Sequence, residues 1–534
     1  MRCLQAGEFP GDLAGPNGSP TRRPVQVSIE SRIRCRMVAL IGVGHNILSS
    51  GCRPDSSLFW KQMTRRRAKN RGRELATQRR VYPLDAHELT EEQIAVAFAM
   101  TSRRPEPFDE IARQVSQEKA ADFHERWVLG YGHASVAEHA VVHLAVENVS
   151  RVAADTLEDN RLASYTEKSS RYQVLPPGAY HIPRELDARP DLRSSFQSAC
   201  NGLFTAYEKC IRQCLEYLRR LQLRQANERE AAYALRLRRI ATDSCRALLP
   251  AATLTNLGVT ANARLLEHAI TKLLSSELAE ERELGEDIKG QARRITPTLI
   301  KYAEPNEYLR YTRKRQQELS SGLEGPAQPF QGQVRLVQWE PQAEARLAAA
   351  LLYRASALGY EEIWSKVLDM TPEQRQEIIG SCLERLGDHD APVRELELVE
   401  YLLEFTLDYG AYREFKRHRM QSYLPQALTI AHGHHTPQLL VDAGAEAGFA
   451  EGVSQAEEAF QRIELASPAA AQYLVTHAHF RRVLSKINLR ECYHLFKLRI
   501  SSQAHESIRG PMQAALDALQ QVHPALFRHL KLRG

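Results

Sequence analysis

Hydrophobic and polar positions follow the same order twice along this chain. Residues 141–149, VVHLAVENV, alternate well enough for a half-buried strand and precede a helical pattern at residues 150–161. In the second half, LVEYLLEFTLDYG at residues 398–410 precedes the helical pattern AYREFKRHR at residues 411–419. The matching order predicts two copies of one structural plan.

The two copies also begin alike. A short apolar strand is expected near residues 79–84, ahead of an amphipathic helix at residues 90–102 that opens with acidic residues. VRLVQWEP at residues 334–341 predicts a strand followed by a second amphipathic helix with a proline near its start. Between the copies, the polar residues 316–333 are rich in Gly, Pro and Ser, which marks a linker.

We therefore expect four segments. Their bounds are 1–79 for a basic tail, 80–318 for the first copy, 319–333 for the linker and 334–534 for the second copy. The tail has no periodic pattern and is typical of a disordered arm, and Met63 is an alternative start of the protein.

Length and charge indicate a globular body with a basic tail. The 534 residues, 43% hydrophobic and 25% charged, are enough for two or more domains with real cores. The net charge is +6, but the first 80 residues hold 16 Lys and Arg against 5 Asp and Glu, leaving 55 basic and 60 acidic residues for the rest. The basic excess therefore belongs to the tail.

Cysteine spacing and hydropathy favour a cytoplasmic protein. The nine cysteines contain no Cys-x-x-Cys pair or zinc spacing, so free thiols in a reducing compartment are expected. The apolar part of residues 32–51 is too short and too interrupted by glycine to span a bilayer.

Three consecutive cations, Arg417, His418 and Arg419, close the helical pattern of the second copy. Neighbouring side chains cannot all point one way on a helix, so Arg417 and Arg419 are expected to hold a ligand from the helix end while His418 faces elsewhere. Guanidinium groups suit the oxygens of phosphate and pyrophosphate. A solvated cationic helix end, favoured by the helix dipole, is the alternative interpretation.

Two short frames recur in both copies. An Arg-x-x-Ser-Tyr frame runs from Arg161 to Tyr165 and from Arg419 to Tyr423. One spacing within helical segments is shared by Asn262, Arg264 and His268 in the first copy and by Asn488, Arg490 and His494 in the second. The Arg and His of each set lie four apart on one helix face, where a structural hydrogen bond is the default interpretation.

Two further segments carry candidate chemistry. GHASVAEH places His133, Ser135 and Glu138 where a helix is expected to begin, and exposed N–H groups there suit an anion, although an ordinary capping segment explains it as well. The histidines of AHGHH invite a metal interpretation, but no carboxylate or cysteine lies at a useful spacing, so we expect no metal. These histidines are His432, His434 and His435.

Taken together, these segments resemble the flavin-dependent thymidylate synthases. The signature of that family is Arg-His-Arg, two residues, Ser, one residue, Asn-Glu, one residue, Ser, one residue, Arg-Tyr, between a Gly-His-x-Ser-x-x-Glu-His segment and an Asn-x-Arg helix. The first copy has GHASVAEH, DNRLASYTEKSSRY and CRALLPAATLTNLGVTANARLLEH, and the second has RHRMQSY and NLRECYHLFKLRISSQAHESIR. The resemblance covers roughly residues 80–530.

The first copy departs from the signature on the flavin side. Asp159 and Asn160 replace the first two residues of the motif, and Thr166 replaces its Asn. The nucleotide side is retained in Arg161, Glu167, Ser169, Arg171 and Tyr172.

The second copy departs on the nucleotide side. Its Arg-His-Arg is intact, but Pro425, Ala427 and Thr429 replace the late Glu, Ser and Arg. The same inversion recurs downstream, where the counterpart of Arg246 is Gln472 and the counterpart of Arg499 is Leu273. Each copy keeps what the other lacks.

The resemblance implies an α+β fold, helix-rich overall, in which each of two tandem copies is a small sheet packed with helices. Active sites in this family lie between the subunits of a homotetramer. A fused pair is then a pseudo-dimer, and two chains are expected to form a homodimer with two composite sites. Whether a site forms within a chain or across the dimer stays open.

The implied reaction is reductive methylation of dUMP to dTMP, with methylenetetrahydrofolate, NADPH and FAD. The expected catalytic residues are Ser169, Arg171, Arg246 and Arg499, and these with Arg161 and Glu167 are expected to bind the substrate. The expected flavin residues are His133, Ser135, Glu138, Arg417, His418, Arg419, Asn488, Arg490 and His494, with Asn262, Arg264 and His268 as secondary candidates. The alternatives are a relative that binds flavin or nucleotide without making dTMP, and a nucleic-acid-associated protein directed by the tail, for which no recognition motif exists in the sequence.

Overall fold

The computed structural model describes residues 79–84, 87–323 and 332–533. The chain forms two units, residues 1–79 and residues 80–534, and the second holds both copies. The expected tail, apart from Arg79, lies outside the described residues, and so do Met63 and residues 324–331 of the expected linker. The bounds of the expected segments stay a prediction.

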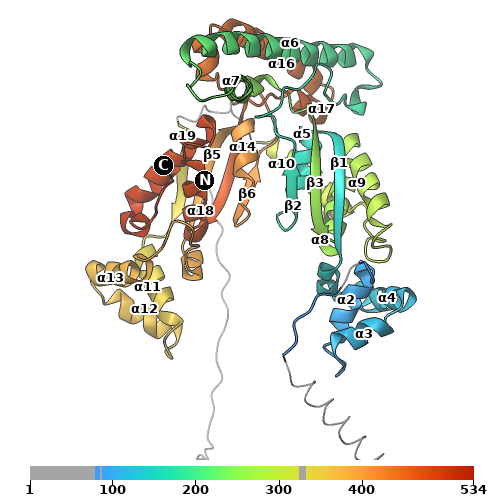
Figure 1. Ribbon diagram of the computed structural model, residues 1–534, viewed down its shortest axis with the longest axis vertical. Helices are drawn as coiled ribbons and strands as arrows, with labels where there is room; N and C mark the ends of the chain where they lie inside the picture. The colour runs from blue at the N-terminus through green and yellow to red at the C-terminus, as the bar shows by residue number, and fades with distance from the viewer. Residues whose placement is uncertain (1–78, 85–86, 324–331, 534) are drawn as a thin grey trace, which may run out of the picture. The chain divides into compact units, whose positions relative to one another are not determined.

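Each copy contains one small antiparallel sheet packed against helices, so the predicted α+β class is confirmed (Figure 1). The first copy has the order β1-β3-β2, with β1 (Val141–Ser150), β2 (Ser164–Glu167) and β3 (Leu254–Asn262). The second has the order β4-β5-β7-β6, with β4 (Val334–Trp339), β5 (Glu400–Asp408), β6 (Gln421–Pro425) and β7 (Phe480–Asn488). The strand expected near residues 79–84 is wrong, because the described residues there form no strand and Pro83 lacks a backbone donor.

Equivalent helices begin at equivalent caps in the two copies. Ser150 caps α5 (Arg151–Glu158) after β1, and Asp408 caps α14 (Tyr409–Phe415) after β5. Asn262 caps α8 (Ala263–Leu274) after β3, and Asn488 caps α18 (Leu489–Arg499) after β7. In each cap the side chain accepts a backbone N–H, which satisfies one of the free donors of a helix start. Counting from these caps makes residues 150–171 equivalent to 408–429, and residues 243–274 equivalent to 469–500.

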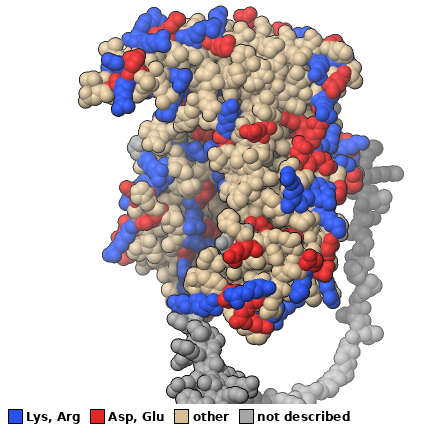
Figure 2. Space-filling view, turned by 45° about the vertical axis from the view of Figure 1, so that its right-hand side comes forward, with Lys and Arg blue, Asp and Glu red and all other residues tan. Residues whose placement is uncertain are grey.

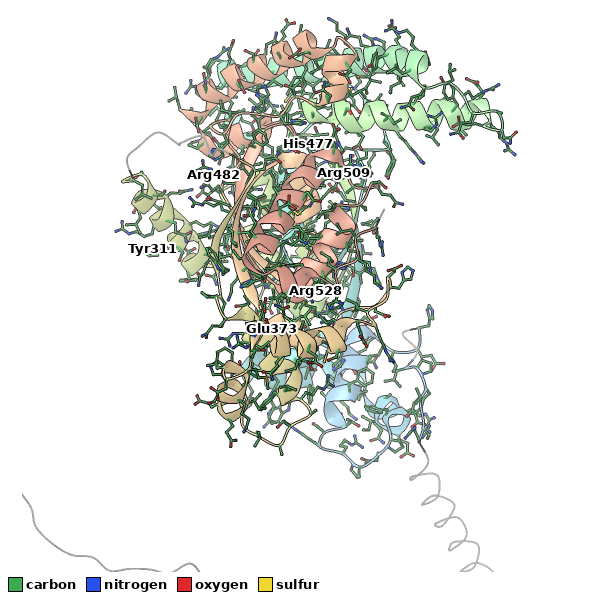
Figure 3. The ribbon with its side chains drawn as sticks, turned by 90° about the vertical axis from the view of Figure 1, so that its left-hand side faces the viewer. Tyr311, Glu373, His477, Arg482, Arg509 and Arg528 are labelled. Atoms are coloured by element: carbon green, nitrogen blue, oxygen red, sulfur yellow. The ribbon has the colours of Figure 1, made fainter. Side chains whose placement is uncertain are left out.

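The two copies share a helical layer and a backbone ladder. The long helix α6 (Pro190–Leu221) packs against α16 (Glu446–Glu464) of the second copy and α7 (Glu230–Cys245) of the first, and α6 and α16 lie side by side in Figure 1. Below them, Ala251 N–H donates to the Val475 carbonyl at 2.8 Å and His477 N–H donates to the Leu249 carbonyl at 3.0 Å. His477 is labelled beneath this layer in Figure 3. The copies are therefore joined by main-chain hydrogen bonds as well as by side-chain packing.

The remaining helices complete the two copies. In the first they are α2 (Glu91–Met100), α3 (Phe108–Gln114), α4 (Gln117–Phe123), α9 (Ala279–Ala292) and α10 (Glu307–Ser320). In the second they are α11 (Ala343–Tyr353), α12 (Tyr360–Leu368), α13 (Pro372–Leu383), α15 (Gln438–Asp442), α17 (Pro468–Ala471) and α19 (Glu506–Val522). The expected helix at GHASVAEH is a 3-10 helix, Ala134–His139.

The described residues also show the state of the cysteines, the distribution of surface charge and the apolar character of the helices. The six described cysteines are all free, as predicted. Figure 2 shows acidic and basic side chains interspersed over the visible face. Within the described residues, no helix combines the length and the apolar character that a bilayer crossing needs.

Candidate functional site

Three of the expected substrate-binding arginines meet at one carboxylate between the two copies. The Glu414 side chain, from α14, lies 3.7 Å from Arg171, 3.4 Å from Arg246 and 3.2 Å from Arg499. Arg171 and Arg246 belong to the first copy, and Arg499 ends α18 of the second. We call these four residues with Asp243 the arginine cluster. All of it comes from a single chain.

The first copy holds its two arginines with Asp243, which lies in the last turn of α7. Asp243 accepts hydrogen bonds from Nε and Nη2 of Arg171, at 2.9 and 2.8 Å, in a two-point geometry that fixes the guanidinium plane. Arg246 follows directly after α7 and lies 3.4 Å from the same carboxylate. The hydroxyl of Ser169 accepts the N–H of Arg171 at 3.2 Å, which places the expected catalytic serine beside the cluster.

The cluster carries a net positive charge. Burial opposes ionisation of Glu414, but Arg246, Arg171 and Arg499 hold its pKa below the usual value. His505 adds no charge at neutral pH, because burial and then Arg246 lower its pKa to about 4. Three guanidinium groups against two carboxylates leave one positive charge, which suits an anionic ligand.

The His418 side chain is buried, whereas the Arg417 side chain is 56% exposed. The helix expected over residues 411–419 ends at Phe415, so both residues lie in the turn that follows α14. The Nε of Arg499 donates to Nε2 of His418 at 2.9 Å, so the histidine proton lies on Nδ1 and is donated to Glu491 at 2.9 Å. Burial raises the pKa of Glu491 to about 7. His418 therefore connects the arginine cluster to Glu491, near the start of α18.

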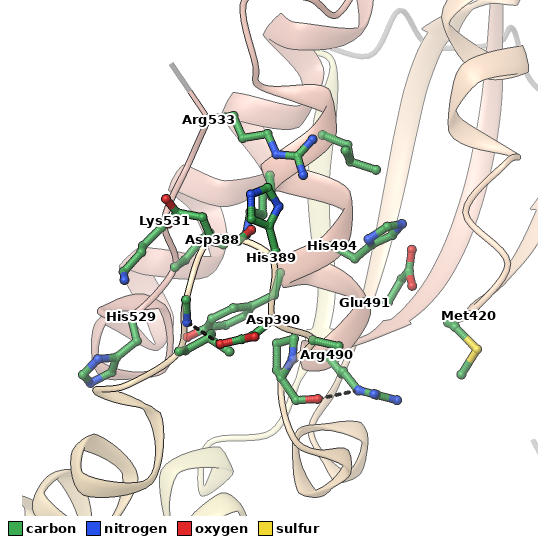
Figure 4. Close-up of a pocket in the computed structure, with 18 of the residues that line it drawn as sticks. Asp388, His389, Asp390, Met420, Arg490, Glu491, His494, His529, Lys531 and Arg533 are labelled. Carbon is green, nitrogen blue, oxygen red and sulfur yellow. Dashed lines mark hydrogen bonds between the residues drawn. The ribbon is translucent and has the colours of Figure 1, made fainter.

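A cavity of about 450 Å³ lies at that start, lined by residues that include Met420, Asn488, Arg490 and His494 (Figure 4). Asn488 and Arg490, expected to hold flavin, have protein partners here. Asn488 caps α18. Arg490 donates to the Pro392 carbonyl at 2.8 Å and pairs with Glu397, which lies in a short 3-10 helix before β5. His494 is exposed to the cavity.

A second cavity, of about 390 Å³, lies between the copies beside the arginine pair 417 and 419. Its lining comprises Glu158, Arg161, Tyr165, Thr166, Glu167, Lys416, Arg417 and Arg419. Arg161 crosses between the copies and donates to the Gln421 carbonyl at 2.6 Å. The expected substrate residues Arg161 and Glu167 thus line this cavity.

Glu167 is a structural anion at the contact between copies. It is buried between Arg151 and Arg413 and forms an ion pair with each. Burial opposes its ionisation, but Arg413 and Arg151 lower the pKa of Glu167 to about 2. Arg417 lies 4.0 Å from Glu167 as well, and Arg417 and Arg419 are exposed cations of this cavity.

The flavin residues expected in the first copy lie elsewhere. His133, Ser135 and Glu138 precede β1, and Glu138 pairs with Arg264. The ten residues of β1 span about 30 Å, and the copies meet at its other end, where Arg151 follows the strand. The structure therefore does not bring these three residues together with His418 or Arg417 in one chain.

One of the three AHGHH histidines, His434, lies beside a carboxylate and a further histidine that sequence spacing did not reveal. His434 and His479 lie 3.2 and 3.1 Å from Glu457 of α16. The Thr476 N–H donates to Nδ1 of His479 at 3.0 Å, so the ring proton lies on Nε2 and points to Glu457. The three groups are thus satisfied as a hydrogen-bonded set. The reason given for expecting no metal was incomplete, and the absence of a metal stays a prediction.

The positions equivalent to Glu414, Asp243 and Arg246 line a second cleft, which we call the twin cleft. It holds a cavity of about 620 Å³ whose lining includes Thr156, Ala427, Ala469 and Gln472. By the register of the caps, the residues Thr429, Ala469, Gln472, Thr156 and Leu273 stand in place of Arg171, Asp243, Arg246, Glu414 and Arg499. None of these five equivalent positions is charged, although other charged side chains, among them Asp155 and Arg481, line the cavity.

Sequence reasoning missed the two carboxylates of the cluster. Asp243 and Glu414 lie outside the family motif, so no motif position pointed to them. Their signal is in the comparison of the two copies: each is acidic only where the arginines are present, and the equivalents are Ala469 and Thr156.

The chain carries two copies of a small α+β domain, and side chains from both copies meet at the arginine cluster. The profile of the family described as thymidylate synthase complementing protein matches this chain at residues 84–298 and again at 335–525. The chain belongs to that family.

Relatives fall into two groups. A UPF0159 protein of Chlamydia muridarum is 34% identical over 444 residues, covering 78% of this chain and 81% of the relative. A UPF0159 protein of Thermoplasma acidophilum is 28% identical over 78% of this chain and 89% of its own length. The flavin-dependent thymidylate synthase of Clostridium tetani is 30% identical over 218 residues, covering 40% of this chain and 83% of that enzyme.

Proposed function

We propose that this protein is a flavin-dependent thymidylate synthase that converts dUMP to dTMP, with methylenetetrahydrofolate as carbon donor and NADPH as reductant. One observation carries the proposal: Arg171 and Arg246 of one copy and Arg499 of the other contact the same side chain within a single chain. Each copy alone lacks one side of the family's site, and the pair supplies both. The site is composite within the chain.

The arginine cluster is assigned to the nucleotide. Arg171 and the Ser169 hydroxyl provide donors for the phosphate, and fixed guanidinium groups stabilise negative charge that develops on a uracil oxygen. Such donors are most effective when they are held in place before the ligand arrives. The two-point contact of Asp243 with Arg171, and the contact of His418 with Arg499, provide that support.

The flavin side is assigned to the cavity at the start of α18 in the second copy and to the cavity between the copies. Their volumes of about 450 and 390 Å³ lie in the usual range for ligand sites. The exposed guanidinium groups of Arg417 and Arg419 fit a pyrophosphate. A flavin held there and reduced by NADPH would supply the hydride that the reaction needs. His133, Ser135 and Glu138 reach this ligand only if a second chain contributes them, which agrees with the expected homodimer.

The full chain provides the test. Purified protein should show the absorption spectrum of bound flavin and should oxidise NADPH in a manner that depends on both dUMP and methylenetetrahydrofolate. Formation of dTMP is measured directly in the same reaction. A flavin-bound protein that oxidises NADPH equally with and without dUMP would refute the synthase assignment. The cytoplasmic location and the lack of a nucleic-acid partner stay predictions.

A relative that binds flavin or nucleotide without making dTMP is the second candidate. It is favoured by Glu414, an anion at the centre of the donors that a phosphate needs, and by the protein partners already held by Asn488 and Arg490. This candidate predicts a flavin spectrum and nucleotide binding with no dTMP.

A further inference from the structure

Glu414 occupies the middle of the arginine cluster. Its side chain is only 9% exposed, and all three arginines assigned to the nucleotide contact its two oxygens. A phosphate group needs the same N–H donors. The Glu414 carboxylate and the phosphate of a ligand therefore compete for the same guanidinium groups.

The twin cleft shows that Glu414 belongs with these arginines. Where Gln472 and Leu273 replace Arg246 and Arg499, the position of Glu414 holds the uncharged Thr156. A carboxylate needed only to start α14 or to pack the interface would have no reason to vanish together with three arginines. Its presence follows the positive charge.

We propose that Glu414 is an internal counter-anion that keeps the three arginines in place in the free protein and competes with the phosphate group of the ligand. The proposal rests on the proposed function for the identity of the ligand, a nucleoside monophosphate. Its electrostatic core concerns any phosphate at this cluster. Glu414 is thus a specificity-determining residue that weakens binding of phosphate-bearing ligands.

Two consequences follow from charge alone. Without Glu414, the cluster keeps Asp243 as its one carboxylate, so its net charge rises from one to two positive charges and its attraction for phosphate increases. The three guanidinium groups also repel one another more strongly, so the free protein loses stability while its phosphate complex gains it. A residue with a purely structural role would lower both.

The test is Glu414→Gln in the full chain, which removes the charge and keeps the shape. Affinities for inorganic phosphate, dUMP and deoxyuridine are measured by isothermal titration at low salt. We expect phosphate and dUMP to bind at least about tenfold more tightly to the variant, because one repelling charge is gone. Deoxyuridine, which has no phosphate, should bind equally to both proteins.

Two further variants guard the interpretation. Glu404→Gln removes one charge from the surface of β5, where Glu404 pairs with Arg335, and should change none of these affinities by more than about twofold. Glu414→Thr installs the residue of the twin cleft and repeats the test if Glu414→Gln does not fold, as judged by thermal unfolding with and without phosphate.

The outcomes separate the two proposals. Tighter binding of inorganic phosphate together with no binding of dUMP would support the role of Glu414 and overturn the nucleotide function. Unchanged or weaker binding of phosphate to a folded variant would overturn the counter-anion, whether or not dUMP binds.

Discussion

At the arginine cluster three guanidinium groups surround Glu414, whereas the equivalent positions in the same chain hold Thr156, Gln472 and Leu273. Both clefts lie between the same two copies and have the same backbone framework. Their difference teaches that the charged residues act as one electrostatic unit. A partial set would leave a buried charge without a partner, which is more costly than removing the whole set.

The largest effect is expected when the substitutions of Arg171 and Arg499 are placed on different chains. Chains with Arg171→Ala are expressed together with chains carrying Arg499→Ala, so that mixed dimers can form. Because both residues contact Glu414 within one chain, every site carries a lesion, and we expect no recovery of dTMP synthesis. Wild-type chains expressed together with Arg171→Ala chains serve as the control and should retain the activity of the wild-type fraction. Recovered activity in the double-lesion mixture would place the site across a dimer.

Giving the arginine cluster the residue of the twin cleft at one position should also cause a large loss of dTMP synthesis. Arg246→Gln introduces the residue that the twin cleft holds at position 472. We expect dTMP synthesis to fall about 100- to 1000-fold, the usual effect of losing one preorganised donor. The matched control Gln472→Ala changes the twin cleft alone and should leave the rate within about twofold. Similar losses in both variants, each checked by thermal unfolding, would mean that the two clefts are functionally alike.

Flavin binding sharpens the comparison at the ends of α14 and α5. Arg417→Ala combined with Arg419→Ala removes two exposed cations from the 390 Å³ cavity. Charge-assisted contacts are worth about 1.5–3 kcal/mol each, so losing two of them should raise the Kd for FAD at least about a hundredfold. The equivalent position in the first copy, changed in Asp159→Ala, should leave flavin content nearly unaltered. Flavin content is read from the absorption spectrum, and equal losses would contradict the assignment.

The free energy of unfolding should depend on pH through the ion pairs of Asp155 in the twin cleft. Asp155 is buried between Lys416 and Arg481; burial opposes its charge, but these cations lower its pKa to about 2. A carboxylate with a depressed folded pKa stabilises the protein above its unfolded pKa and loses that contribution as pH falls. The free energy of unfolding should therefore lose on the order of 2 kcal/mol between about pH 5 and pH 2 through this group.

The Asp155→Asn variant checks this contribution. Its difference from wild type in denaturant unfolding should shrink as pH falls from 5 to 2. Asp159→Asn, which alters an exposed partner of Lys272, is the matched control and should differ from wild type by less than about 0.5 kcal/mol. A difference for Asp155→Asn that is constant with pH would mean that packing, and not its charge, matters there.

The sequence predicted the parts of this structure that depend on local pattern. The alternating residues of β1 and β5, and the helical residues of α5 and α14, recur in each copy, so their elements and order could be recognised. The orientations of Arg417, His418 and Arg419 could not follow from helix geometry, because α14 ends at Phe415 and these residues lie in the turn after it. The strand expected near residues 79–84 failed because a short apolar run containing a proline specifies little by itself.

The contacts of the site could not be predicted in the same way. Arg246 and Glu414 are 168 residues apart, and no local pattern reports such a pair. Arg490 and Asn488 fitted a flavin motif, yet one pairs with a nearby loop and the other caps a helix. Residues that match a motif and residues that stabilise a fold use the same chemistry, and only their neighbours distinguish them.

The main-chain ladder between Leu249–Ala251 and Val475–His477 fixes the register of two copies whose sequences can change independently. In a homodimer with a twofold axis, one substitution appears in both sites at once. Here the two halves are encoded separately and still held in the same register, so a change at Gln472 spares Arg246. One cleft is thereby free to vary under selection for packing alone while the other keeps its chemistry. Under the proposed function, such a chain would bind one nucleotide per 60.5 kDa, half the stoichiometry of two unfused domains.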